Sequence, residues 1–268
     1  MSRIVVDTGP WQRAPRRLPA GQAVFAIGDV HAHAEHLWVL HERISAIIAL
    51  EHDDDAVSVV WLGDYIDRGW EPLQTLDLVA AGLGQPGVTE VRLLGNHERF
   101  LLDAATGRNL TLPRLLHWWR YGGEETLTCL APEAALEDPE AVGAALYESL
   151  GESRIGFLEG LPLQHRIGDY VFAHAGLNPD RRLEDQDEDD LLWIREPFLS
   201  GWDWPHPVTV VHGHTPEGPV ALPHRIGVDS GVFASGSLSA VELRGGELRF
   251  LTTRIEGVVP QDIGANSY

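Results

Sequence analysis

Lysine is absent from this chain of 268 residues, so arginine supplies all 20 of its Lys and Arg side chains. Walker P-loops, protein kinase active sites, Schiff-base aldolases and pyridoxal phosphate enzymes all use a lysine nitrogen as a charge clamp or as a nucleophile. The composition therefore excludes these classes. Any recognition of phosphate by this chain must rest on arginine and metal.

Cysteine is almost absent as well, because Cys129 is the single one. One thiol excludes an intrachain disulfide, a four-thiolate zinc site and a redox CxxC pair. Cys129 also lacks the surroundings of a cysteine phosphatase nucleophile. That type of loop needs an arginine six positions further on, and Ala135 stands there.

The chain has no apolar run close to the roughly 20 residues of a membrane-spanning helix. Its 40 acidic residues give a formal net charge of -20, which argues against nucleic acid or an anionic membrane as a direct partner. Arg16 and Arg17 suggest a twin-arginine signal, but Pro19, Gly21, Gly28 and Asp29 interrupt the segment that follows. We therefore expect a cytoplasmic protein.

Strand and helix patterns alternate along the first third of the chain. Apolar runs predict strands at 23–27, 57–62 and 88–94, and helical spacing predicts helices at 37–48, 72–81 and 97–105. This alternation indicates a largely parallel sheet, with ligands expected beyond the carboxyl ends of its strands.

The remaining segments define the expected domain organisation. We predict an N-terminal tail (1–20), a single domain (21–255) and a C-terminal tail (256–268), with a helical cap inserted at 107–160. Strands are expected again at 170–173 and 208–211, followed by short strands with Gly-rich turns over 224–253. The acidic run 184–190 is interpreted as a solvated loop or helix start, with a regulatory cation site as the alternative.

Five predicted strands end on Asp, Asn or His next to Gly. These ends are Gly28-Asp29-Val30-His31, Gly63-Asp64-Tyr65-Ile66-Asp67-Arg68-Gly69, Gly95-Asn96-His97-Glu98, His174-Ala175-Gly176 and His212-Gly213-His214-Thr215. A single histidine at a strand end is usually structural. Five such ends are hard to attribute to packing, because buried polar groups are costly unless they are paired or bound to metal.

The residue types indicate the metal. Carboxylate, imidazole and carboxamide groups without thiolate suit Mn, Fe or Zn rather than a thiolate-rich zinc site. Six such groups are too many for one catalytic metal with an open position. They suit two metals that share a carboxylate, an arrangement in which a bridging hydroxide attacks phosphorus in line with the leaving oxygen.

In order, these motifs resemble those of the calcineurin-like metallophosphoesterases, and more narrowly those of the bacterial branch of the phosphoprotein phosphatases. The resemblance covers residues 23–245 and includes Leu191-Leu192-Trp193-Ile194-Arg195-Glu196 and Ile226-Gly227-Val228-Asp229-Ser230-Gly231. It implies an α/β fold of two packed mixed β-sheets flanked by helices, with the site where loops from both sheets meet.

The resemblance also implies roles for single residues. The expected ligands of two divalent metal ions, Mn first and Fe or Zn as alternatives, are Asp29, His31, Asp64, Asn96, His174 and His214, with Asp64 bridging. His97 is the expected general acid and Asp67 its orienting partner. Arg68 and Arg195 are expected to bind the phosphate oxygens, for which a planar guanidinium group is well shaped.

We therefore expect a phosphomonoesterase that acts on phosphoserine and phosphothreonine in proteins, with phosphotyrosine or a small phosphoester as further substrates. The main alternative is a symmetrical diadenosine tetraphosphate hydrolase, which shares nearly every metal motif. Glu98 favours the protein phosphatases, since the nucleotide hydrolases usually have Asp after the Asn-His pair. A non-catalytic metal-bound adaptor is disfavoured because His97, Asp67 and both arginines are present.

Smaller features leave further readings open. Ala32 stands where the family usually has Gly. The stretch 31–36 also resembles the HxHxDH motif of metallo-β-lactamase-like hydrolases, with Glu for Asp, but this reading leaves the other strand ends unexplained. His33 and His212 lie beside ligand positions without filling them. Trp202 and Trp204 are interpreted as packing residues, with an aromatic wall beside the site as the alternative.

Overall fold

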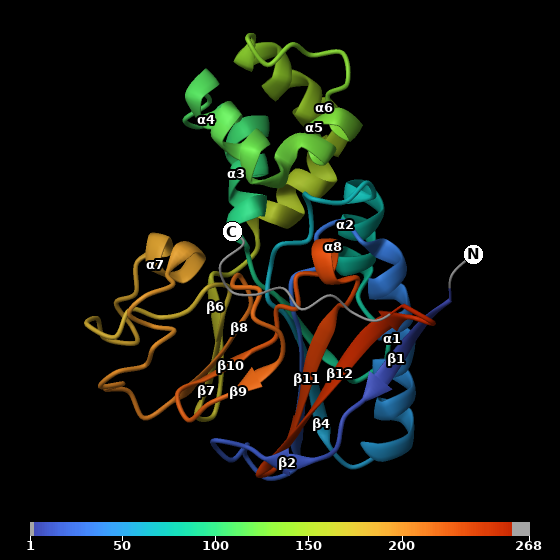
Figure 1. The fold of residues 1–268 in the computed structure, drawn as a ribbon, viewed down its shortest axis with the longest axis vertical. Coiled ribbons are helices and arrows are strands. Elements are labelled where there is room, and N and C mark those ends of the chain that lie inside the picture. Colours follow the sequence, from blue (N-terminus) through green and yellow to red (C-terminus); the bar gives the residue numbers. More distant parts are fainter. Residues whose placement is uncertain (1–2, 259–268) are drawn as a thin grey trace.

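The computed structural model describes residues 3–258, in which two β-sheets pack face to face with helices outside them (Figure 1). The first sheet has the strand order β1-β12-β11-β3-β4-β5, with β2 paired to β12, and the second has the order β6-β7-β8-β10-β9. Both sheets mix parallel and antiparallel neighbours. The predicted α/β class with two packed mixed sheets is confirmed.

The bounds of the elements follow the strand-and-helix alternation of the sequence. The strands are β1 (Ile4–Thr8), β2 (Gln12–Arg13), β3 (Gln22–Ile27), β4 (Ala56–Trp61), β5 (Thr89–Arg92), β6 (Gln164–Ile167), β7 (Tyr170–Ala173), β8 (Thr209–His212), β9 (Val220–Ala221), β10 (Arg225–Gly227), β11 (Ser239–Arg244) and β12 (Glu247–Ile255). The helices are α1 (Ala34–Glu51), α2 (Pro72–Ala81), α3 (Asn96–Ala105), α4 (Leu112–Trp118), the π-helical turn η1 (Trp119–Gly123), α5 (Glu124–Leu130), α6 (Pro139–Glu159), α7 (Glu188–Trp193) and α8 (Val232–Ser235).

The core is layered because successive side chains of a strand point to opposite faces. In β3, Val24 and Ala26 lie in the apolar layer between the two sheets, which also contains Phe172 of β7 and Val211 of β8. Residues of opposite parity, such as Phe25, pack instead under the helices that cover the first sheet. The outer face of the second sheet is covered by the segment around α7.

The predicted N-terminal tail is partly wrong. Within residues 1–20, β1 pairs antiparallel with β12 from Ile4↔Ile255 to Thr8↔Leu251, and β2 also pairs with β12. The run of Ile4, Val5 and Val6 has the β-branched residues that favour a strand. It is only partly buried, and its partner strand lies at the other end of the chain, so its local pattern is weak. Of the predicted C-terminal tail, residues 259–268 lie outside the described residues.

The predicted insertion at 107–160 contains α4, η1, α5 and α6, which stand above the sheets in Figure 1. Leu115, Leu127 and Leu146 of this insertion are buried in the same apolar cluster as Leu101 of α3. The insertion is therefore packed onto the helix that follows β5 rather than held at a distance. Among the described residues, no helix has the length and apolar character needed to cross a bilayer.

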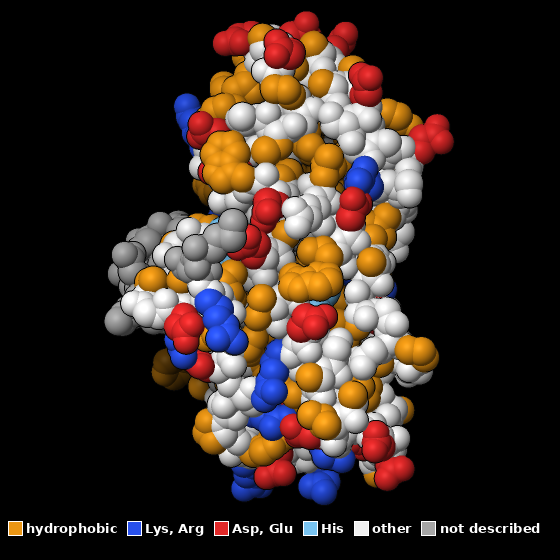
Figure 2. Space-filling model, turned by 90° about the vertical axis from the view of Figure 1, so that its right-hand side faces the viewer, with side chains coloured by type: hydrophobic (Ala, Val, Ile, Leu, Met, Phe, Trp, Pro, Cys, Tyr) orange, Lys and Arg blue, Asp and Glu red, His pale blue; other side chains and the backbone are white. Residues whose placement is uncertain are grey.

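The acidic surplus is unevenly distributed on the face seen in Figure 2. Carboxylates gather at the outer tip of the helical insertion, whereas most of the arginines visible on this face lie in its lower half. The connection between α5 and α6 accounts for acidic residues at this end, with Glu133, Glu137 and Asp138 in sequence.

A buried charge network fastens the end of α1 to the first sheet. His52, which follows α1, contacts Asp55 through Nδ1 at 2.8 Å and Glu242 of β11 through Nε2 at 2.9 Å. Glu242 also accepts a hydrogen bond from Arg249 of β12 at 2.6 Å. Burial alone would lower the pKa of His52, but its hydrogen bonds to Glu242 and Asp55 outweigh this effect and raise the pKa.

We predict that this network makes stability fall at alkaline pH. Because the pKa of His52 is raised by folding, its contribution is fully present below the unfolded pKa of about 6.5 and is lost as pH rises through the folded pKa. His52→Ala should lower the free energy of unfolding by about 3 kcal/mol at pH 6, the lower end of the cost of breaking a buried pair. The difference from the wild type should shrink by pH 9, as measured by urea unfolding.

His165→Ala is the matched control, since burial lowers the pKa of His165. Its difference from the wild type should grow, not shrink, as pH rises from the lowered folded pKa to the unfolded value of about 6.5, and should stay constant above it. A pH-independent effect of His52→Ala would contradict the proposed charge network.

Candidate metal centre

The carboxyl ends of five strands meet at one place between the two sheets. β3, β4 and β5 are parallel neighbours, so the loops that follow them leave the same edge of the first sheet. β7 and β8 are parallel neighbours in the second sheet, and their loops face the first set. All six predicted metal ligands lie in these loops with no more than 8% of their surface exposed; they are Asp29, His31, Asp64, Asn96, His174 and His214.

Hydrogen bonds across the two sheets hold this arrangement. The backbone N–H of His214 donates to Asp29 Oδ2 at 2.9 Å, and His174 Nδ1 lies 2.8 Å from the carbonyl oxygen of Leu62. Between two loops of the first sheet, His31 Nδ1 contacts the carbonyl of Ile66 at 2.9 Å. A backbone carbonyl accepts only from a protonated nitrogen, so each contact places the proton on Nδ1 and leaves the Nε2 lone pair available as a ligand.

Asp64 is the centre of the group. One carboxylate oxygen lies 3.9 Å from His31 Nε2 and 3.8 Å from His97 Nε2, and the other lies 3.4 Å from His174 Nε2. Burial alone would raise the pKa of Asp64. The charges of His174, His97 and His31 outweigh this effect and hold the pKa well below its usual value. Asp64 is therefore ionised among imidazole rings.

Two groups of side chains in the described residues have the spacing of a metal site. His31, Asp64 and His97 form the first group, and Asp64, His174 and His214 form the second, with the candidate ligand atoms of each within 4.8 Å of one another. The two groups share Asp64. Asn96 Oδ1 lies beside the second group, 2.7 Å from His174 Nε2 and 2.9 Å from His214 Nδ1.

The donor set fits a pair of divalent cations. Asp29 Oδ1 and His214 Nε2 are buried and have no hydrogen-bond partner. Burial, then the charges of Asp229 and Asp64, raise the pKa of Asp29 well above its usual value. A cation would relieve this crowding of carboxylates, and nitrogen and oxygen donors without sulfur suit Mn, Fe or Zn.

The first group differs in one member from the set expected from sequence. It contains His97, which we expected as the general acid, and does not contain Asp29. Asp29 instead lies beside His214, with one carboxylate oxygen hydrogen-bonded to the backbone and the other unpaired. The assignment of Asp29 as a ligand and of His97 as the acid stays a prediction.

The loops of the centre are held in unusual backbone conformations. Among the described residues, eight non-glycine residues have positive φ, and six of them lie in these loops: His31, Ala32, Asp64, Asp67, Arg68 and His214. Such conformations cost free energy and persist only where the surroundings impose them. Ala32 at φ 53° explains why glycine is the usual residue at this position, since glycine adopts positive φ without a steric penalty.

Asp67 and His97 form a pair beside Asp64. His97 Nδ1 lies 2.6 Å from Asp67 Oδ2, and the charges of Asp64 and Asp67 raise the pKa of His97 against the opposing effect of burial. Trp118 of the insertion donates its indole N–H to the same oxygen at 2.6 Å. Thr126 accepts a hydrogen bond from the backbone N–H of Asp67 at 3.1 Å.

The sequence gives no sign of these supports from the insertion. Trp118 and Thr126 lie more than 50 positions from Asp67. Their side chains are ordinary helix residues in sequence, and no local pattern connects them with Asp67.

Glu98 has a structural role that its motif did not reveal. It is fully buried, and its carboxylate accepts N–H groups from Asp64 at 2.8 Å, Tyr65 at 2.8 Å and Gly95 at 3.1 Å. It therefore joins the loops after β4 and β5. These hydrogen bonds occupy the carboxylate of Glu98. Glu98 can therefore affect the choice of substrate only through the geometry of these two loops.

The two predicted phosphate-binding arginines line one cavity of about 490 Å³ beside the centre, together with Phe233. The guanidinium carbon of Arg68 lies 4.2 Å from the centroid of the Phe233 ring, and that ring meets His31 edge-on at 5.4 Å. Arg195 follows α7, whose Trp193 meets His214 edge-on at 6.1 Å. Both arginines thus border residues of the centre.

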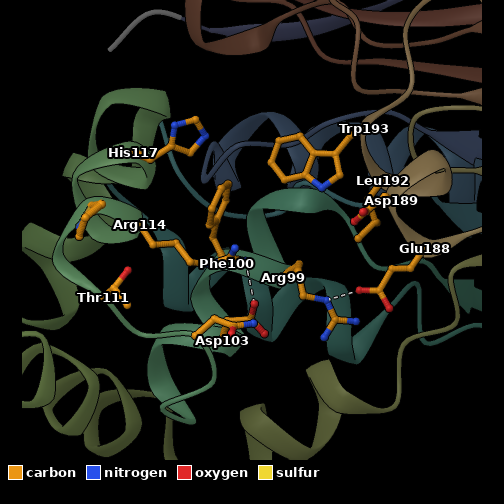
Figure 3. A pocket seen from close by; sticks show the side chains of 12 residues that line it. Arg99, Phe100, Asp103, Thr111, Arg114, His117, Glu188, Asp189, Leu192 and Trp193 are labelled. Carbon is orange, nitrogen blue, oxygen red and sulfur yellow. Dashed lines mark hydrogen bonds and ion pairs between the residues drawn. The ribbon is translucent and has the colours of Figure 1, made fainter.

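A second cavity of about 730 Å³ lies between α3, α4 and α7 (Figure 3). Phe100, His117 and Trp193 give it an aromatic wall, and the ion pair of Arg99 with Glu188 crosses its floor at 2.6 Å. Because Trp193 also contacts His214, this cavity adjoins the centre.

Side-chain contacts decide several interpretations that the sequence left open. His36 bonds to Thr253 at 2.7 Å, away from the centre, so the HxHxEH stretch does not converge on a metal. Burial and Arg225 lower the pKa of His212 to about 3, and its ring packs on Phe198. Trp204 also packs on Phe198, whereas Trp202 is 83% exposed.

The acidic run at 184–190 is largely exposed, and its second half starts α7. Several of its carboxylates pair with arginine, including Glu188 with Arg99 and both Asp187 and Asp190 with Arg181. These contacts match a solvated helix start.

A family model described as calcineurin-like phosphoesterase matches residues 23–235. The chain belongs to this family. The resemblance drawn from the strand-end motifs is thereby confirmed, and the description of the family as phosphoesterases agrees with the predicted enzyme class.

The relatives come from both branches that the sequence leaves open. The chain is 30% identical over 203 residues to a symmetrical bis(5'-nucleosyl)-tetraphosphatase of Dechloromonas aromatica, an alignment covering 67% of this chain and 61% of that protein. It is 26% identical over 230 residues to serine/threonine-protein phosphatase 2 of Salmonella typhimurium, covering 82% of this chain and 93% of that protein. The alignment with a symmetrical bis(5'-nucleosyl)-tetraphosphatase of Methylococcus capsulatus covers only 44% of the length of that protein.

Solved structures support the fold. The cold-active protein-tyrosine phosphatase of a psychrophilic Shewanella superposes with a TM-score of 0.58 at 18% identity, covering 88% of this chain and 80% of that one. At this identity the likeness concerns the fold alone.

We predict that Asp64→Asn loses metal. Since Asp64 belongs to both groups, loss of its charge should remove at least one of the about two Mn ions expected per wild-type chain. Elemental analysis after Mn loading and desalting measures the content. Asp103→Asn is the matched control, because its carboxylate lies in the wall of the second cavity outside both groups. Full metal content in Asp64→Asn would rule out the shared ligand.

Proposed function

We propose that the protein is a phosphomonoesterase that hydrolyses phosphoserine and phosphothreonine in proteins, and accepts phosphotyrosine or a small phosphoester. The observation that supports this proposal is that two groups of candidate metal ligands share Asp64. The contact between His97 and Asp67 lies next to it. Two divalent ions bound there, Mn first and Fe or Zn as alternatives, would supply a water of lowered pKa and positive charge for the phosphate oxygens.

The residues around the centre have distinct tasks in this proposal. Asp29, His31, Asp64, Asn96, His174 and His214 hold the metal ions. His97 donates a proton to the departing alkoxide oxygen, and Asp67 keeps the imidazole oriented through the 2.6 Å contact with Nδ1. Arg68 and Arg195 bind the phosphate oxygens from the cavity that both line. No Ser or Cys nucleophile is required.

One relative supports a protein substrate. The alignment with serine/threonine-protein phosphatase 2 of Salmonella typhimurium covers 82% of this chain and 93% of that protein.

The second candidate is hydrolysis of dinucleoside tetraphosphates. Its specific support is the cavity of about 730 Å³ next to the centre, whose aromatic wall of Phe100, His117 and Trp193 offers stacking surfaces for a nucleobase. The Dechloromonas relative carries the corresponding name.

We predict a higher initial rate on phosphoserine peptides than on diadenosine tetraphosphate with Mn present. Rates on phosphoserine peptides, phosphotyrosine peptides and diadenosine tetraphosphate would be compared at equal concentration, with phosphate release measured for the peptides and nucleotide products (ADP, or ATP and AMP) measured for the dinucleotide. Markedly better turnover of the dinucleotide would overturn the protein-substrate proposal in favour of the second candidate.

We predict that His97→Asn lowers kcat by at least about 100-fold, the contribution usual for general acid catalysis. Its metal content should equal that of the wild type, because the proposed ligands are untouched. His165→Asn, a partly exposed histidine of β6 outside the centre, serves as the matched control and should retain full activity. An unchanged rate for His97→Asn, or a parallel loss of metal, would overturn the assignment of His97 as the acid.

A further inference from the structure

A third arginine lines the cavity that contains Arg68 and Arg195. Arg120 comes from the π-helical turn η1 of the insertion and borders the same space of about 490 Å³, in which Glu125 is the one acidic wall residue. The chain as a whole has twice as many acidic as basic residues. The three guanidinium groups therefore give this opening an excess of positive charge, in contrast to the acidic chain as a whole.

The turn that carries Arg120 is fastened by the backbone of Arg68. The N–H of Arg68 donates to the carbonyl of Gly122 at 2.8 Å, so the turn is fastened to the loop that follows β4. Gly122 has φ 105°, and a Cβ atom there would lie 2.4 Å from Arg68 Cγ. A residue with a side chain at 122 would push the two segments apart. The turn thus brings Arg120 to the cavity by direct contact with a predicted phosphate-binding residue.

The charge of Arg120 is not neutralised by a carboxylate. Within residues 3–258, neither Arg120 nor Arg195 forms an ion pair, and both are exposed at the opening. Many other arginines are paired, including Arg99 with Glu188 and Arg225 with Glu217. Side chains held beside a cavity without a counter-charge are available to an anionic ligand.

The three arginines occupy different sides of the cavity. Arg68 stacks on Phe233, which contacts His31, and Arg195 follows Trp193, which contacts His214, so these two border the centre. Arg120 precedes Tyr121, whose ring lies 4.3 Å from that of His117 on α4, so it belongs to the insertion side. A phosphoryl group at the centre therefore meets Arg68 and Arg195 first, with Arg120 further out.

We propose that Arg120 is a specificity-determining residue that binds a second anionic group of the substrate, next to the phosphoryl group being cleaved. The inference rests on the proposed function. The second group is a phosphate or a carboxylate, both of which a guanidinium fork binds with paired hydrogen bonds. An acidic residue beside a phosphoserine and the adjoining phosphate of a polyphosphate chain are two sources of this chemistry.

The test uses three non-hydrolysable ligands that differ in the second group. Methylphosphonate carries one anionic group, phosphonoacetate adds a carboxylate, and methylenediphosphonate adds a second phosphonate. Calorimetry measures their dissociation constants for the Mn-loaded protein, with Mn in excess over the ligand so that chelation does not strip the centre. The wild type should bind at least one two-anion ligand about tenfold more tightly than methylphosphonate, as expected for one added charge-assisted hydrogen bond.

Arg120→Gln should abolish most of this preference, and Arg120→Lys should restore part of it. Arg108→Gln is the matched control, because Arg108 also lies in the insertion but pairs with Glu159 at the surface, and it should keep the wild-type ratio. A gain for phosphonoacetate identifies a carboxylate as the second group, and a gain for methylenediphosphonate alone identifies a phosphate.

Two outcomes would overturn the proposal: equal binding of all three ligands by the wild type, or an unchanged ratio in Arg120→Gln with its thermal unfolding intact. Failure of the proposed function is recognised separately. A Mn-loaded wild type that hydrolyses neither p-nitrophenyl phosphate nor the peptides and dinucleotide would refute that function, whereas the ligand ratios still measure the role of Arg120.

Discussion

The buried carboxylate of Glu98 is the constraint on which the metal centre depends. It receives backbone N–H groups from the strained loop after β4 and from the loop after β5, and so fixes the two loops relative to each other. The fit is tight, since a Cβ atom on Gly95 would lie 2.2 Å from Asp64 Oδ1. The hydrogen bond to Glu98 and the close approach of Gly95 restrict the backbone of Asp64. They hold it at positive φ among three histidines.

The insertion contributes to the centre as well as to the core. Trp118 reaches the oxygen of Asp67 that also contacts His97, and the next turn of the same segment carries Arg120 to the adjoining cavity. Both side chains come from three consecutive residues of one chain segment, 118–120. Orientation of the proposed proton donor and selection of the substrate thus have a common structural support.

Much of the centre could be predicted from sequence because its residues directly follow apolar strands. Asp29, Asp64 and Asn96 stand at the ends of runs that read clearly as strands, and parallel pairing brings such ends together. Contacts between distant segments left no such trace. Trp118 reads as a helix residue, and the pairing of β1 with β12 joins segments about as far apart as the chain allows.

The function of Glu98 shows a different limit. Its position in the motif was visible, but its partners are backbone N–H groups, which every residue has and no sequence pattern marks. Arg120 was likewise invisible, because its placement depends on a carbonyl of Gly122 and on the unusual backbone of one turn. The side chains of the centre can be read from the sequence. The backbone contacts that hold these side chains in place cannot.

The place of β12 in the first sheet has a consequence for synthesis of the protein. β12 lies between β11 and β1, and it also pairs with β2, so both N-terminal strands have their partner at residues 247–255. On the ribosome, these first strands are made long before that partner exists. The parallel core of β3, β4 and β5 can assemble early, but the edge of the sheet closes only when β12 has emerged from the exit tunnel.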